Sequence, residues 1–123
     1  MTNDSRGRIR VEPGVERVRV EVDGVTVADS TSPRMLFETG MPTRYYLPKT
    51  DVRLDLFEPS RTITHCPYKG SAEYYSVRIK DTLHSDIAWY YRTPIPESST
   101  IAGLVAFYTE KVDLYVDEVL QEA

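Results

Sequence analysis

The sequence R-V-R-V-E-V-D-G-V-T-V, from Arg17 to Val27, indicates the fold class most directly. Valine alternates with charged residues up to Asp23-Gly24, and the alternation resumes beyond that pair. A period of two with β-branched side chains is typical of a strand with one buried face. An Asp-Gly pair between two such runs favours a type I′ turn, because both central positions need a positive φ. The stretch therefore predicts a β-hairpin.

Short apolar or alternating runs recur along the rest of the chain, each bounded by proline, glycine or polar residues. Regularly spaced short strands with turn signals between them favour an antiparallel sandwich or a partly open barrel. Asp51 would be the N-cap of a single helical turn over 51–56, and 81–85 would be a polar connection. Residues 112–120 fit either a strand or helical spacing, and we favour the strand. The remaining expected strands are 35–38, 44–47, 61–66, 72–80, 86–92 and 104–108.

The composition indicates a single soluble domain over residues 1–123, with 1–8 loosely ordered. A net charge of −4 argues against a nucleic-acid-binding surface. One cysteine can form neither an internal disulfide nor a cysteine-rich zinc site. No apolar run approaches the roughly 20 residues that span a bilayer, and the first residues form no signal-peptide core. We therefore expect a cytoplasmic protein with no metal, cofactor or membrane contact.

The stretch T-H-C-P-Y-K-G-S-A-E-Y-Y-S-V, from Thr64 to Val77, concentrates the reactive side chains. Cys66 is the candidate catalytic nucleophile, since a nearby Lys69 or the donors of the Cys-Pro turn would favour its thiolate. His65 is a poor base for it, because adjacent strand residues point to opposite faces. Cys66 equally fits a small buried hydrophobic side chain beside a turn.

A polar and aromatic set of residues predicts a ligand site. Glu38 ends an apolar strand and Lys69 sits in a turn, where its ammonium would meet an anionic ligand or pair with Glu38 or Asp51. Aromatic walls with a few polar groups are typical of small-molecule sites, although the same rings also suit a small core. Lys69 would hold an anionic group, Glu38 would orient a donor, and the rings would enclose a planar part. The predicted ligand-binding residues are Glu38, Tyr46, Lys69, Trp89 and Tyr91, with Tyr74 as a further ring of the cleft.

Four ordered motifs carry a family resemblance: Y-L-P-K-T-D-V at 46–52, T-H-C-P-Y-K-G-S-A-E-Y-Y at 64–75, A-W-Y-Y at 88–91 and I-A-G-L-V-A-F-Y at 101–108. From about Val18 to Tyr115 the chain resembles the bacterial domain of unknown function 427 family, which also bears a nucleotidyltransferase-like label. The resemblance implies a β-tent, in which two antiparallel sheets meet at an angle, as in methionine sulfoxide reductase B and the thalidomide-binding domain of cereblon. Many β-tent proteins hold zinc through paired C-x-x-C motifs, which this sequence lacks. It also lacks a P-loop and a Gly-Ser plus Asp-x-Asp arrangement.

These observations predict a mainly β fold of two antiparallel sheets, β-tent or sandwich-like, with at most short helical turns. The leading functional hypothesis is a domain that binds a small, anionic or planar ligand. The second is a thiol-dependent enzyme that uses Cys66, by analogy with the fold of the sulfoxide reductases. The third is a non-catalytic domain that forms homodimers through exposed tyrosines. The residues leave open whether any reaction is catalysed.

Overall fold

The computed structural model describes residues 9–122, apart from the side chain of residue 97, so the prediction for residues 1–8 lies outside the described part. Within that part, eleven strands form three antiparallel sheets and the only helical segments are short 3-10 turns. Sheet A has the order β1–β4–β5, sheet B the order β11–β10–β2–β3, and sheet C the order β6–β7–β8–β9. The strands are Ile9–Pro13 (β1), Val18–Val22 (β2), Val25–Ser30 (β3), Arg34–Glu38 (β4), Arg44–Tyr46 (β5), Phe57–Cys66 (β6), Gly70–Ile79 (β7), Thr82–Tyr91 (β8), Val105–Phe107 (β9), Asp113–Val116 (β10) and Val119–Leu120 (β11), and the 3-10 turns are Lys49–Asp51, Leu54–Leu56 and Pro96–Ile101.

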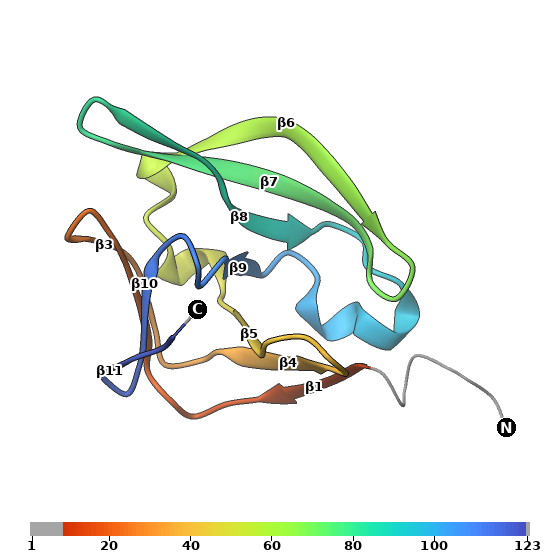
Figure 1. Cartoon of the computed structure of the whole chain (residues 1–123). Helices are drawn as coiled ribbons and strands as arrows, with labels where there is room; N and C mark the ends of the chain where they lie inside the picture. Colours follow the sequence, from red (N-terminus) through yellow and green to blue (C-terminus); the bar gives the residue numbers. More distant parts are fainter. Residues whose placement is uncertain (1–8, 123) are drawn as a thin grey trace, which may run out of the picture.

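The sheets enclose the core from three sides. Sheet C arches over the molecule, β1 and β4 lie beneath it, and β2, β3 and β10 close one side (Figure 1). Sheets A and C are joined just beyond β5, where Leu47 and Val105 exchange two backbone hydrogen bonds of 2.8 Å. The predicted mainly β class with short helical turns is confirmed, and the strands divide into three sheets where two were expected.

Two hairpins of sheet B show how the turn residues determine the local fold. Asp23 and Gly24 have φ values of 50° and 76°, which confirms the hairpin between β2 and β3. Asp117 and Glu118 also have positive φ, at 49° and 65°, and connect β10 to β11. Two consecutive left-handed residues end a strand in a tight turn and are incompatible with an α-helix. Within 112–120, the favoured strand is thus Asp113–Val116 (β10), and the turn at Asp117 and Glu118 leads back into β11.

Three local expectations were incomplete or wrong. Strand β1 was not predicted, and the expected polar connection 81–85 is mostly the start of β8, which pairs with β7 after a turn at Lys80. This end of the β7–β8 hairpin is largely exposed, so its residues lack the apolar alternation by which a strand is detected. Asp51 is not an N-cap, since its carboxylate instead accepts a hydrogen bond of 2.7 Å from the Ser30 hydroxyl.

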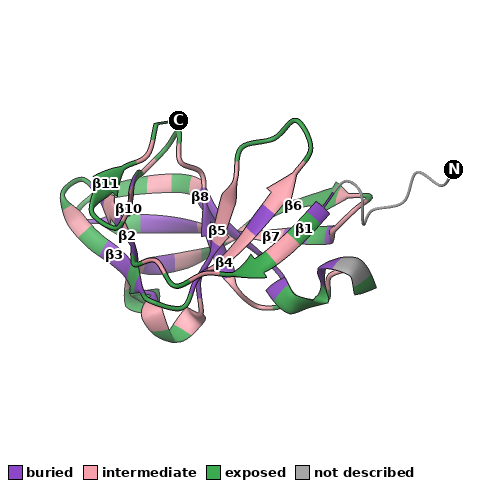
Figure 2. Ribbon diagram, turned by 90° about the horizontal axis from the view of Figure 1, so that it is seen from below, coloured by how far each residue is buried: buried purple, intermediate pink, exposed green. Residues whose placement is uncertain are grey.

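Buried residues, purple in Figure 2, occur in all three sheets, and their side chains form two clusters. The larger cluster lies between sheets B and C and is mainly aliphatic, with an edge-to-face contact between Phe57 and Phe107. The smaller cluster lies between sheets A and C and is rich in aromatic rings. Its buried members are Ile9, Leu36, Tyr46, Ala72, Tyr74, Trp89, Tyr91, Ile101 and Ala106.

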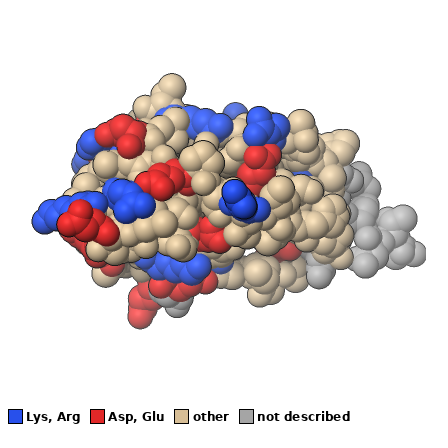
Figure 3. Space-filling view, turned by 90° about the horizontal axis from the view of Figure 1, so that it is seen from above, with Lys and Arg blue, Asp and Glu red and all other residues tan. Residues whose placement is uncertain are grey.

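The outer face of sheet C carries basic and acidic side chains that are interspersed, without a broad patch of one sign (Figure 3). Nucleic-acid-binding surfaces usually concentrate Lys and Arg on one face, and this face does not. In the part of the chain that the structure describes, no helix is long and apolar enough to cross a membrane.

Strand β6 lies at the edge of sheet C, and its register with β7 shifts between Pro59 and Ile63. Asp86 of β8 holds this irregular segment. Its carboxylate accepts a hydrogen bond of 2.7 Å from the Thr62 hydroxyl, and the bonds from Ser60 and Thr62 lower the pKa of Asp86. Because the pKa is lower in the folded chain, the ionised carboxylate stabilises the fold above the unfolded-state pKa, and this contribution is lost as the pH falls through the folded-state pKa.

The Asp86→Asn variant should therefore be less stable than the wild type at neutral pH, and the difference should shrink in acid. Asparagine tolerates the positive φ of 52° at this position, so the backbone is preserved. We expect a constant difference down to about pH 4, near the pKa of an unfolded aspartate, and a smaller one below it. Urea unfolding of both proteins across this pH range measures the difference in their free energies of unfolding. A difference that stays constant into strong acid would contradict the role given to this carboxylate.

Candidate functional site

A cleft of about 130 Å³ lies between sheets A and C, on the aromatic side of the junction. Its volume is close to the roughly 150 Å³ of a cavity that accepts benzene, and below the range of about 300–1,000 Å³ typical of drug-sized ligands. We call it the aromatic cleft. The lining residues are Glu38, Met41, Pro42, Arg44, Lys69, Tyr74, Trp89, Tyr91 and Tyr108.

Four of the five predicted ligand-binding residues line this cleft, together with the predicted Tyr74. The fifth, Tyr46, is fully buried behind Trp89 and accepts a hydrogen bond of 3.0 Å from its indole Nε1. Burial raises the pKa of Tyr46, so its hydroxyl stays neutral at ordinary pH. Tyr46 therefore holds Trp89 in place, and Trp89 itself faces the cleft.

Glu38 and Lys69 form an ion pair in the cleft. The Lys69 ammonium donates to Glu38 Oε1 at 2.9 Å, and each side chain is only 12% exposed. Lys69 is positioned by the turn from Cys66 to Gly70, where Gly70 has a φ of 113°. A Cβ at Gly70 would lie 3.5 Å from backbone atoms of Thr93 and Pro94, so a glycine lets the turn approach that segment closely. The sequence had left open whether these two charges meet.

Aromatic rings form most of the remaining wall. Trp89 and Tyr108 lie 4.4 Å apart between ring centroids, and the hydroxyls of Tyr74 and Tyr108 share a hydrogen bond of 3.0 Å. Burial raises the pKa of both Tyr91 and Tyr108, so their hydroxyls remain protonated at neutral pH. The cleft thus offers ring faces and neutral hydroxyls rather than phenolates.

Arg44 and Tyr108 are the lining residues with polar chemistry that the sequence reasoning missed. The guanidinium carbon of Arg44 lies 5.4 Å from the ring centroids of both Trp89 and Tyr108. Strand alternation could have found Arg44, because residues 44 and 46 of β5 share one face and Tyr46 was already predicted. Tyr108 follows the end of β9, and no local pattern indicates where its ring points.

The Cys66 thiol is half-buried and does not belong to the lining of the aromatic cleft. His65 is exposed, and its Nδ1 lies 3.5 Å from the Ser71 hydroxyl. Among the described residues, no histidine is hydrogen-bonded to Cys66. The thiol-dependent enzyme therefore stays a prediction without an assembled base.

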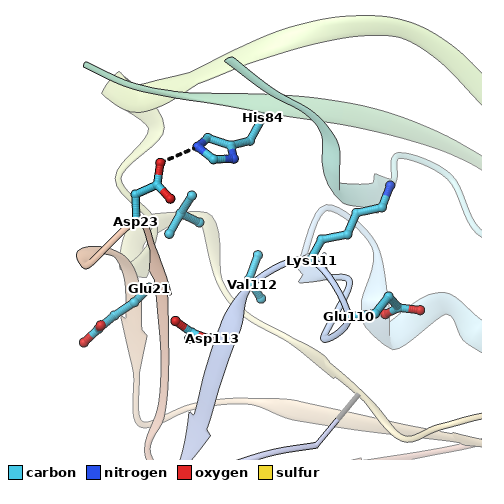
Figure 4. A pocket seen from close by; sticks show the side chains of 8 residues that line it. Glu21, Asp23, His84, Glu110, Lys111, Val112 and Asp113 are labelled. Carbon is cyan, nitrogen blue, oxygen red and sulfur yellow. Dashed lines mark hydrogen bonds and ion pairs between the residues drawn. The ribbon is translucent and has the colours of Figure 1, made fainter. Parts of the chain in front are cut away.

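His84 lies in a second, more open hollow of about 280 Å³, which we call the His84 hollow (Figure 4). Its Nε2 is 2.9 Å from an oxygen of Asp23, and the two side chains point toward each other (Figure 4). The Glu21 and Glu110 carboxylates extend away from this pair (Figure 4). They form ion pairs with Arg19 and Arg44 respectively. Glu21 and Glu110 thus have partners of opposite sign within the protein. Within residues 9–122, no cluster of three or more His, Cys, Asp or Glu side chains is arranged to hold a metal ion.

A protein-family model described as a domain of unknown function, DUF427, matches residues 10–118. The chain belongs to this family. No curated protein shows a significant match to the chain. Because the DUF427 match spans every residue that lines the aromatic cleft, the cleft is part of the DUF427 domain itself.

Proposed function

We propose that this DUF427 domain binds a small planar ligand in the aromatic cleft. The observation that supports it best is the Glu38–Lys69 ion pair, which lies largely out of solvent on the wall of a ring-lined cleft. Desolvating two charges costs free energy that a surface pair avoids, so such a pair is weak evidence for a purely stabilising role. A ligand that offers both a donor and an acceptor would bond to the two partners at once.

The rings supply the second part of the argument. Trp89, Tyr91, Tyr74 and Tyr108 surround a volume that suits a single ring, and stacked or edge contacts between aromatic groups contribute about 0.5–1.5 kcal/mol each beyond the buried area. An apolar wall with a few converging polar groups is the usual composition of a small-molecule site. The polar groups would then fix the orientation of a ring that the wall attracts.

Trp89 provides a direct test, because it is the only tryptophan of the chain and it lines the cleft. A panel of single-ring planar compounds, neutral and anionic, should include members that change Trp89 fluorescence and raise the melting temperature by mass action. For such a compound, the Tyr108→Leu variant should bind at least about ten-fold more weakly, a loss of roughly 1.4 kcal/mol. Calorimetric titration gives the same dissociation constants independently of fluorescence.

Tyr115→Leu is the matched control for this test. Tyr115 is also a half-buried tyrosine with an arginine over its ring, Arg19 at 4.3 Å, but it lies in sheet B outside the cleft. Its substitution should leave the dissociation constant unchanged. Equal losses in the two variants, or a panel without any binder, would count against the proposal. Loss of binding in Cys66→Ser with Tyr108→Leu unaffected would instead favour the thiol hypothesis.

A further inference from the structure

The two cations of the aromatic cleft, Lys69 and Arg44, differ in how far their hydrogen-bond donors and charge are already matched by other groups of the protein. Lys69 donates a hydrogen bond of 2.9 Å to Glu38, and the two side chains are equally buried. This pair carries no net charge. An incoming anion at Lys69 would therefore also meet the repulsion of the neighbouring Glu38 carboxylate.

Arg44 is less completely satisfied, although its side chain is only 11% exposed. A guanidinium has N–H donors on all three nitrogens, yet among the described residues only Nη1 has hydrogen-bond partners. These partners are the Thr109 hydroxyl and the Glu110 carboxylate, both at 3.3 Å, which is beyond the usual range of about 2.7–3.2 Å for N–H···O bonds. Glu110 is itself 50% exposed, so its attraction is screened. Arg44 thus retains donors and positive charge for a further acceptor.

The neighbouring rings define the shape of that acceptor. Trp89 and Tyr108 both lie beside the guanidinium, and a planar ligand against these rings would bring a substituent at its edge to Arg44. A guanidinium binds a carboxylate through two parallel hydrogen bonds, a geometry that a single ammonium does not offer. The cleft volume of about 130 Å³ leaves room for one ring.

We infer that Arg44 is the anion-binding and specificity-determining residue of the aromatic cleft, and that the ligand class is a single-ring aromatic carboxylate. This inference rests on the proposed function, and it moves the anion from Lys69, where the sequence had placed it, to Arg44. The Glu38–Lys69 pair then orients the opposite, uncharged part of the ligand.

The test compares benzoate with benzamide, which keeps the ring and removes the charge, and with acetate, which keeps the charge and removes the ring. Calorimetric titration of the full chain should give benzoate a dissociation constant at least about ten-fold below those of the other two. In Arg44→Met, the dissociation constant of benzoate should rise by about ten-fold or more, while that of benzamide should stay unchanged. Arg44→Lys keeps the charge but cannot form the two parallel hydrogen bonds. Its dissociation constant for benzoate should therefore lie between those of the wild type and Arg44→Met.

Two further variants separate the roles of the cations. Arg78→Lys is the matched control, because Arg78 is a strand arginine with one carboxylate partner, Glu58, outside the cleft. The double variant Glu38→Gln/Lys69→Met leaves the net charge unchanged. It should weaken the binding of benzoate less than Arg44→Met does. Melting temperatures show which variants are folded, and Arg44→Lys carries the test if Arg44→Met is not.

The outcomes distinguish the two proposals. If benzoate and benzamide bind with equal affinity, or if both Arg44 variants bind benzoate as tightly as the wild type, the assignment of Arg44 is overturned while binding in the cleft stands. If neither compound binds and no other planar compound does, both proposals fall. Tight binding of acetate without any gain from the ring would overturn the ligand class.

Discussion

The Phe107→Ala variant should unfold with a free energy about 3–5 kcal/mol below that of the wild type. Phe107 is 1% exposed in β9 and packs edge to face against Phe57 at 5.9 Å between ring centroids, in the cluster between sheets B and C. Truncation removes the buried ring and leaves a cavity that the surrounding strands can fill only in part. Because domains of this size are stable by only about 5–15 kcal/mol, the loss would be a large share of the total.

Urea unfolding followed by circular dichroism measures this effect, with Ile63→Ala as its control. Ile63 is 67% exposed on the edge strand β6, so its truncation should change the free energy by no more than about 0.5 kcal/mol. Comparable losses in the two variants would mean that the contact between sheets B and C does not carry the stability assigned to it.

The Lys69→Met variant should lose about 3 kcal/mol, because it leaves the Glu38 carboxylate largely out of solvent without its partner. The double variant Glu38→Gln/Lys69→Met removes the uncompensated charge and should recover most of the loss. A double-mutant cycle completed with Glu38→Gln isolates the coupling between the two side chains. We expect this coupling to exceed the value of up to about 1 kcal/mol typical of exposed pairs.

The matched control for this cycle is Lys49→Met. Its ammonium lies 4.4 Å from the ring centroid of Tyr90, outside the cleft, and no carboxylate would be left alone by its removal. A coupling between Glu38 and Lys69 indistinguishable from zero would contradict the buried character of the pair.

The fold could be predicted from sequence where local chemistry determines it. The Asp23-Gly24 turn requires positive φ, and the valines that flank it have one buried face, so both signals point to the same hairpin. The first half of β8 carries no such alternation, and in β1 the alternation covers only Ile9 to Glu12 before Pro13. Their strand state comes from pairing with β4 and β7, which is a tertiary effect. The division into three sheets likewise depends on which strands meet across the core.

The cleft was predictable from residue types at strand ends and turns. Lys69 beside Gly70 in a turn and Glu38 at the end of an apolar strand each suggested a polar group near rings, and the structure brings them to 2.9 Å. Arg44 was missed because an arginine in a strand most often faces solvent. Its shared face with Tyr46 could have indicated that it points inward, and the bridge that joins the end of β5 to β9 brings its guanidinium beside Trp89 and Tyr108.

The irregular register of β6 has a consequence for self-association. An edge strand of ten residues would normally offer a continuous row of backbone donors and acceptors, along which other chains can add and aggregate. Here Pro59 lacks an N–H, and the shift between Pro59 and Ile63 bends the row. Another chain can therefore pair with only part of β6 at a time. The irregular segment that Asp86 holds in place protects the long edge of this DUF427 domain against intermolecular sheet growth.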